Sequence, residues 1–318
     1  IDAALGAETL PLVGFLVLVV VLFSLATPLF LTAANLGSMA FQMPVLGLLT
    51  LAMMVPILSG GLNLAIIYTA NLSGLTLAAV LLAYGGPDAG PGAFVLGSLA
   101  ALAVGGLSGA VMGAVVAYIG AHPILVSLAM MIFLRGLGEF MTRGGDISGF
   151  PEYMNVLGHG HFLGLPVPLL VFFVFAIIWH VMLSRTRHGF TVFMVGSNIR
   201  AAEYSGLRTK RNLTLLYTIS GLICAEARFN SVRVGHGEAL LLVTVLACFL
   251  GGVDPFGGFG RVLPVVLALM ILQALSSGLN LIGANQHLST AVWGLFLIGV
   301  MVLRWVGARW QTRKKGGA

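Results

Sequence analysis

The sequence predicts an all-α, polytopic membrane protein with about ten transmembrane helices. The 318-residue chain is 58% hydrophobic and only 8% charged, whereas soluble domains are about a quarter charged. Its mean hydropathy is +1.04. Charge-poor runs recur along almost the whole chain, and a helix needs about 20 such residues to cross roughly 30 Å of hydrocarbon. We therefore interpret residues 1–318 as a single transmembrane domain.

Ten charge-poor runs are candidates for membrane spans. They are Leu10–Leu31, Met39–Leu58, Leu62–Tyr84, Ala93–Ile119, Pro123–Met141, Pro166–Leu183, Leu213–Phe229, Ala239–Leu250, Val262–Ile282 and Leu288–Val306. The eighth is short, so we expect a broken or tilted helix there. From a cytoplasmic N-terminus, ten crossings place the basic segment 185–212 and the basic tail 304–318 inside, as the positive-inside rule requires. The loop 142–165 then lies outside.

Five spans in each half would allow a 5+5 inverted repeat. Its only support in the sequence is the recurrence of Gly-Leu-Asn-Leu at 61–64 and 278–281, together with a Gly-Gly pair at 60–61 and at 251–252. The formal net charge of +6 arises largely from the central segment and the tail. It indicates contact with anionic lipid and not with nucleic acid.

Polar residues interrupt the spans at a few places. Gly60, Gly61 and Asn63 separate the second and third runs, where paired glycines favour a broken or re-entrant helix. We expect this break to lie beside a translocation path. Asn71 is either a hydrogen-bonding contact between helices, which we favour, or part of the path. Asn280 lies in a polar stretch of the ninth run and is a further candidate, because its amide suits a hydroxyl-bearing solute.

Other features have structural explanations that we prefer. Four glycines at helical spacing, Gly105, Gly106, Gly109 and Gly113, favour close packing of helices. Arg135 and Glu139 are four residues apart and should form an ion pair sooner than a proton relay. Cys224 and Cys248 match no metal or redox spacing and should be buried. A metal site at His159 and His161 is weakly supported, because no further ligand stands at a suitable spacing.

The segment 195–212 is a long polar interruption that should form a short helix. Ser197 or Asn198 is suited to cap its N-terminus, and Ser205-Gly206 is suited to end it. Such a helix has only about two turns and cannot span a bilayer. Between Arg185 and Arg211 the chain carries six Lys or Arg residues and one acid, Glu203. The helix should therefore lie at the cytoplasmic mouth of the protein, where it could press on a soluble partner, although an ordinary basic loop remains an alternative.

The string G-S-N-I-R-A-A-E-Y-S-G-L, residues 196–207, resembles the cytoplasmic coupling segment of permease subunits of ABC importers, in the monosaccharide branch. Matching residues are Gly196, Asn198, Ala201, Ala202, Ser205 and Gly206. The resemblance extends over about residues 35–305, although Asn63 stands where an Asp is usual in that family. It implies that this segment, Glu203 included, docks in a groove of an ATP-binding cassette subunit, with the small residues fitting the groove.

The resemblance implies that residues 1–318 form a permease subunit that translocates a small polyhydroxylated solute, such as a monosaccharide or polyol, by alternating access. Its expected partners are the ATP-binding cassette subunit, a periplasmic solute-binding protein, a second permease copy or paralogue, and the lipid bilayer of a bacterial inner membrane. No nucleic acid is expected. No G-x-x-x-x-G-K-[ST] motif occurs in the sequence, so ATP and Mg should bind the partner subunit, and this chain should hold no cofactor and catalyse no reaction.

Three alternatives remain open. One is an ion-coupled secondary transporter that would use Glu139, Glu226 or Glu238, although these acids lie near the ends of spans. Another is an ABC permease for branched-chain amino acids or another small solute. The third is an enzyme or assembly subunit embedded in the membrane, for which the sequence offers no recognisable catalytic constellation.

Overall fold

The computed structural model describes residues 2–143, 145, 151, 160–162, 164–226, 238–285, 288–289, 291–296, 298–299 and 302. Its helices and strands, in chain order, are α1 (Asp2–Ala26), α2 (Ala33–Leu58), α3 (Ile66–Ala83), the 3₁₀ turn η1 (Gly86–Asp88), α4 (Pro91–Ala114), the π turn η2 (Val115–Ile119), α5 (Pro123–Thr142), β1 (His161–Phe162), β2 (Leu165–Pro166), α7 (Val167–Arg185), α8 (Arg187–Ser197), α9 (Ile199–Tyr204), α10 (Thr209–Glu226), α11 (Glu238–Leu250) and α12 (Val262–Leu281). The all-α class is confirmed, since the described residues contain helices and one antiparallel pair of strands with two residues each.

Seven helices in the described part of the chain are long and apolar enough to cross a membrane: α1, α2, α3, α4 continued by η2, α5, α7 and α12. The predicted eighth span is indeed short, because α11 has 13 residues. The predicted seventh span is present as α10, but this helix starts at Thr209, earlier than expected, and takes in Lys210 and Arg211. The tail 304–318 and most of the loop 142–165 lie outside the described residues, and the last predicted span is described only in part.

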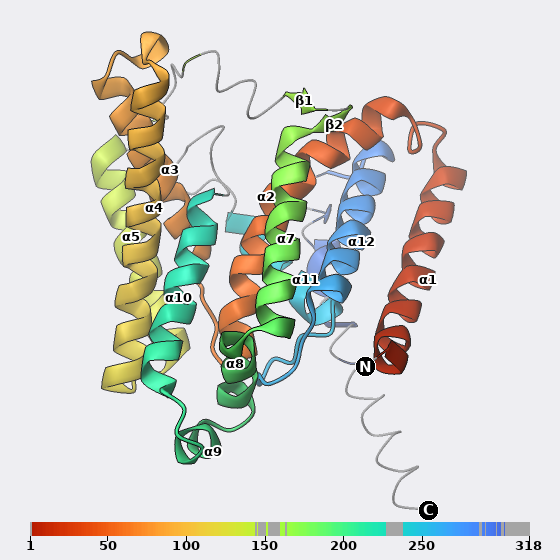
Figure 1. The fold of residues 1–318 in the computed structure, drawn as a ribbon. Helices are drawn as coiled ribbons and strands as arrows, with labels where there is room; N and C mark the ends of the chain where they lie inside the picture. Colours follow the sequence, from red (N-terminus) through yellow and green to blue (C-terminus); the bar gives the residue numbers. More distant parts are fainter. Residues whose placement is uncertain are drawn as a thin grey trace, which may run out of the picture.

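Figure 1 shows two groups of roughly antiparallel helices with α2 running between them. Helices α3, α4, α5 and α10 form one group, while α7, α11, α12 and α1 lie on the other side of α2. The short helix α9 projects from one end of the molecule. The β1–β2 pair, which closes the predicted outer loop, lies at the opposite end. The segment 185–212 is therefore presented away from residues 161–166.

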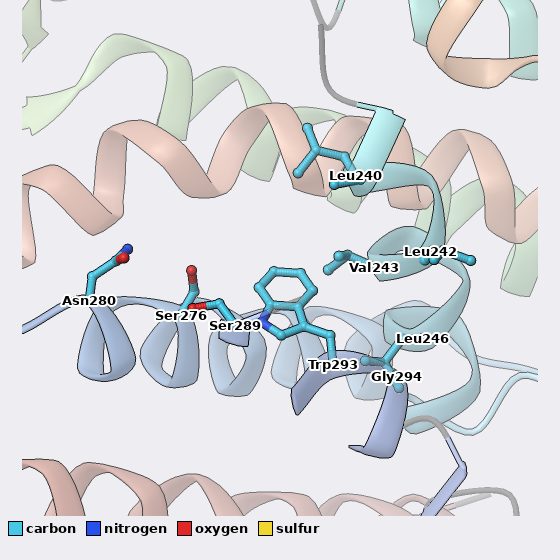
Figure 2. Close-up of a pocket in the computed structure, with 10 residues that line it drawn as sticks. Leu240, Leu242, Val243, Leu246, Ser276, Asn280, Ser289, Trp293 and Gly294 are labelled. Carbon is cyan, nitrogen blue, oxygen red and sulfur yellow. The ribbon is translucent and has the colours of Figure 1, made fainter. Parts of the chain in front are cut away.

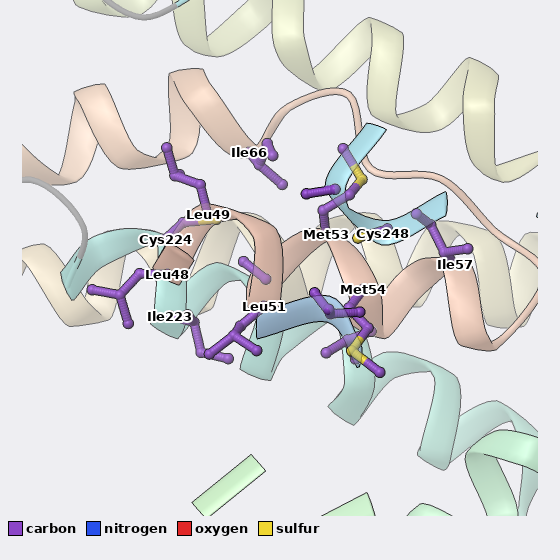
Figure 3. Packing of buried hydrophobic residues seen from close by; sticks show 14 of the residues in the cluster. Leu48, Leu49, Leu51, Met53, Met54, Ile57, Ile66, Ile223, Cys224 and Cys248 are labelled. Carbon is purple, nitrogen blue, oxygen red and sulfur yellow. The ribbon is translucent and has the colours of Figure 1, made fainter. Parts of the chain in front are cut away.

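The core is centred on α2. Leu49, Leu51, Met53 and Met54 of this helix have no exposed surface. Figure 3 shows them packed with side chains of α3, α10 and α11, among them the two cysteines. Cys224 and Cys248 are free and buried, as predicted. The hydrocarbon chains of lipids are as apolar as a leucine side chain, so burial against other helices brings little hydrophobic gain inside a membrane. The core is therefore stabilised mainly by close packing.

Helices α4 and α10 pack with their backbones in contact. A Cβ atom added at Gly109 would meet the carbonyl of Tyr217, and one added at Gly113 would lie 2.7 Å from the Cα of Thr214. On the facing helix, Gly221 is equally close to the backbone of Gly105. The predicted packing role of these α4 glycines is confirmed, because any larger side chain would force the two helices apart.

Candidate functional site

The short helix α9 has the ends that its sequence predicts. The side chain of Asn198 caps its N-terminus, since Oδ1 accepts a hydrogen bond of 3.0 Å from the amide of Ala201. At the other end Gly206 adopts a φ of +75°, a left-handed conformation that favours glycine. The amides of Gly206 and Leu207 then donate to the carbonyls of Glu203 and Ala202 at 2.9 and 3.2 Å. This is the Schellman arrangement, which satisfies the last carbonyls of a helix.

The face of α9 that meets the membrane helices is defined by Ala202. Its side chain has no exposed surface and belongs to the main core cluster, so a partner cannot touch it in this conformation. Glu203 also holds α9 in place, because its Oε1 accepts a hydrogen bond of 3.1 Å from the hydroxyl of Thr209 at the start of α10. The small size of Ala202 is thus explained by packing within the chain.

The opposite face of α9 presents Arg200 and Tyr204. Successive residues of a helix are about 100° apart, so both lie about 160° around the helix from Ala202. Both are exposed, and 93% of the Tyr204 surface is free. The family-based expectation did not single out either residue. Their four-residue spacing, combined with the burial of Ala202, identifies them as the outermost side chains of the helix.

The end of α8, which leads into α9, makes close backbone contacts with the end of α2 and with the turn between α11 and α12. A Cβ atom added at Gly196 would meet the carbonyl oxygen of Leu58, the last residue of α2, and would lie 2.5 Å from the amide nitrogen of Gly258. Gly257 is equally close to Gly60, with 2.5 Å between its added Cβ and the Gly60 nitrogen. We call this meeting of Leu58, Gly60, Gly196, Gly257 and Gly258 the glycine junction.

The glycine-rich turn between α11 and α12 supplies one side of the glycine junction. The amide of Gly258 donates a hydrogen bond of 2.9 Å to the carbonyl of Leu58. Asp254 shapes the turn, since its Oδ1 accepts from the amide of Phe256 at 2.8 Å and its own amide donates to the carbonyl of Phe259 at 2.9 Å. The contacts of Gly258 with Leu58 and with Gly196 join residues that lie 200 and about 60 positions apart in the sequence, and no local pattern predicts them.

The break after α2 is closed by hydrogen bonds. Gly60 has a φ of +80°, and Gly61 is packed against the hydroxyl of Tyr217 and the ring of Pro123. Asn63 is completely buried. Its Oδ1 accepts from the amide of Ala65 at 3.0 Å, and its Nδ2 donates to the hydroxyl of Ser220 at 3.3 Å. The predicted broken helix is present, and the buried side chain of Asn63 is hydrogen-bonded within the chain.

The predicted path residues therefore lie in different surroundings. At the α9 end of the molecule Gly61 and Asn63 are buried while Gly60 is exposed, and Asn71 is 2% exposed inside α3. Asn280 is exposed and lines a cavity of about 400 Å³ between α11, α12 and residues 288–294. Asn280 is thus a predicted path residue that borders a cavity. Whether the others line a path stays a prediction.

The charged residues show no buried coupling site in the described part of the chain. Arg135 and Glu139 form the predicted ion pair, with Nε and Oε1 at 2.9 Å and side chains about half exposed. The side chains of Glu226 and Glu238 lie outside the described residues, as does His159. The described His, Cys, Asp and Glu residues form no group of three that could hold a metal ion.

Comparison with known proteins gives a consistent match over most of the chain. Residues 35–303 match the family described as "Branched-chain amino acid transport system / permease component". The chain is 31% identical over 307 residues to the autoinducer 2 import system permease protein LsrD of Yersinia enterocolitica. The matched region covers 93% of this chain and 91% of the relative. The chain is 28% identical over 322 residues to LsrD of Salmonella typhi, covering 96% and 95% of the two chains. No solved structure matches the chain.

Proposed function

We propose that this chain imports a small, uncharged, polyhydroxylated solute. The premise is that it belongs to the branched-chain amino acid transport system permease family. It is therefore a multi-pass transport subunit of an ABC importer and not an enzyme. A monosaccharide, a polyol or a sugar-like signal such as autoinducer 2 fits the description of the solute. We also propose that the protein lies in a bacterial inner membrane. The translocation path would be formed together with a second permease, either another copy or a paralogue. Members of this family work with an ATP-binding subunit and a substrate-binding protein.

The orientation of α9 is the observation that carries the proposal. One face of this helix is anchored through Ala202, while Arg200 and Tyr204 project from the end of the molecule. An exposed Tyr beside an Arg is typical of the residues that dominate protein interfaces. We assign this face as the contact with the ATP-binding subunit. The coupling role expected for the surrounding segment goes with this assignment and includes Gly196, Asn198, Ala201, Glu203, Ser205 and Gly206. ATP and Mg would bind that subunit and not this chain.

The glycine junction supports a mechanical role for this segment. Helix α9 follows directly on α8, and Gly196 at the end of α8 contacts both the end of α2 and the turn before α12. Since a close-packed junction transmits displacement and does not absorb it, a partner that pulls α9 would shift α2 and α12 together. Alternating access would then consist of this shift, driven by closure of two ATP-binding subunits.

The test is reconstitution of the complete importer in proteoliposomes. The permease, its ATP-binding subunit and its solute-binding protein are combined, and uptake of labelled D-ribose, autoinducer 2 and leucine is measured with and without internal ATP. We expect ATP-dependent uptake of a hydroxylated solute. Uptake of leucine alone would support the branched-chain amino acids that the family description names. Uptake driven by a proton or sodium gradient without ATP would contradict the proposal.

A further inference from the structure

The cavity beside Asn280 is built by two helices and by residues that follow them. It has a volume of about 400 Å³ and is lined by Ala239, Leu240, Leu242, Val243, Leu246, Ser276, Asn280, Ser289, Trp293 and Gly294. Figure 2 shows the indole ring of Trp293 between α11 and α12, with Leu240 and Val243 on one side and Ser276 and Ser289 on the other. Pockets for small molecules begin at about 300 Å³, so this one suits a small solute.

Trp293 carries an unpaired donor at this cavity. Its Nε1 atom is buried and has no hydrogen-bond partner among the described residues. A buried N–H group without an acceptor is unfavourable, and most such groups in proteins are paired. An acceptor supplied by a bound molecule would remove this penalty. The hydroxyl of Ser289 donates to the carbonyl of Asn285 at 3.3 Å, which leaves its oxygen able to accept.

The lining defines the chemistry of the molecule that fits. None of the ten described lining residues is an acid or a base, so among them an amino acid finds no charged partner for its ammonium or carboxylate group. A neutral molecule with several hydroxyl groups needs no such partner. Its C–H faces would pack on the indole ring and on Val243, and its hydroxyls would pair with the Trp293 N–H, the two serines and Asn280.

We propose that this cavity is a solute-binding site inside the permease, in which the indole N–H of Trp293 and the hydroxyl of Ser276 hold a neutral polyhydroxylated solute. The inference rests on the proposed function and deepens it, because it places the contact with solute in α11, α12 and the following helical residues. Asn280 thereby keeps its predicted role in the path. Leu240, Val243 and Leu246 form the apolar wall of the site.

Thiol labelling of the complete importer tests the site directly. A Ser276→Cys variant is treated with a small charged methanethiosulfonate reagent during turnover, with and without D-ribose or autoinducer 2 on the binding protein. Cys224 and Cys248 have no exposed surface and should not react. We expect solute to slow labelling of the introduced thiol several-fold. A Ser184→Cys variant at the exposed end of α7 is the matched control, and its labelling should not respond to solute.

Substitution of the indole gives a second readout. Trp293→Phe keeps an aromatic ring but removes the N–H, so solute uptake at sub-saturating solute concentration should fall roughly five- to tenfold, the effect of one neutral hydrogen bond. Normal uptake by Trp293→Phe, together with Ser276→Cys labelling that solute does not slow, would overturn the site while leaving the permease assignment intact. Absence of ATP-dependent uptake by the unmodified importer would overturn both.

Discussion

The amide of Gly258 donates a hydrogen bond of 2.9 Å to the carbonyl of Leu58, and this bond joins the turn before α12 to the last residue of α2. Gly196, at the end of α8, packs against both of its atoms. The segment that leads to α9 thus touches both the end of α2 and the turn before α12. The following predictions test whether this contact, the α9 surface and the nearby polar groups have the roles assigned to them.

Gly196→Ala should uncouple ATP hydrolysis from uptake. The added methyl group has no space beside the Leu58 carbonyl and the Gly258 amide, so their hydrogen bond must lengthen or break, at about 1 kcal/mol. We expect lower thermal stability of the purified importer and fewer solute molecules transported per ATP. Gly136→Ala is the control, because nothing lies within 4 Å of a Cβ there and alanine favours a helix. Wild-type transport per ATP in Gly196→Ala would contradict a mechanical role for the glycine junction.

Tyr204→Ala and Arg200→Ala should weaken binding of the ATP-binding subunit. Truncation of a central Tyr or Arg at an interface often costs about 2 kcal/mol or more, which corresponds to roughly a 30-fold loss in affinity. Affinity can be measured with the permease in nanodiscs. The stability of the permease itself should not change, since neither side chain is buried. Tyr84→Ala, which is 62% exposed and follows the far end of α3, should bind normally. Equal affinity for all three variants would argue against this surface.

Asn63→Leu should destabilise the protein more than Asn63→Asp does. Leucine leaves the buried Ala65 amide without its acceptor, at about 1–3 kcal/mol, whereas an aspartic acid at this position retains an oxygen that can accept from it. The measurement is the temperature at which the purified protein loses its monodisperse peak. Lost uptake with unchanged stability in Asn63→Leu would instead place this residue on the path, as its position at the break first suggested.

Glu139→Gln should leave ATP-driven uptake unchanged. The ion pair with Arg135 is half exposed, and such pairs contribute about 0–1 kcal/mol. Uptake by the variant is compared with that of the unmodified protein, first with ATP and then with only an imposed proton or sodium gradient. Arg135→Gln serves as the control for loss of the pair. Gradient-driven uptake that disappears in Glu139→Gln alone would favour the ion-coupled alternative.

Sequence reasoning predicted the features that depend on neighbours within a few residues. The bounds of α9 follow from the Asn198 cap and from Gly206, and the Arg135–Glu139 pair follows from a spacing of four. Most spans were predicted because an apolar run that is long enough to cross lipid has few other stable conformations. The start of α10 was predicted less well, since Lys210 and Arg211 continue the helix beyond the apolar part that marks a span.

The amino-acid sequence by itself determined the membrane class, most of the helices and the position of the short polar helix, because each depends on local hydrophobicity, capping and spacing. Only the tertiary structure decided that Ala202 faces inward while Arg200 and Tyr204 face outward, that Gly196 lies between Leu58 and Gly258, and that Trp293 borders the same cavity as Asn280. These relationships join residues from distant parts of the chain or depend on which face of a helix is covered. They arise because many helices pack against one another at the same time, and no short stretch of sequence specifies that packing.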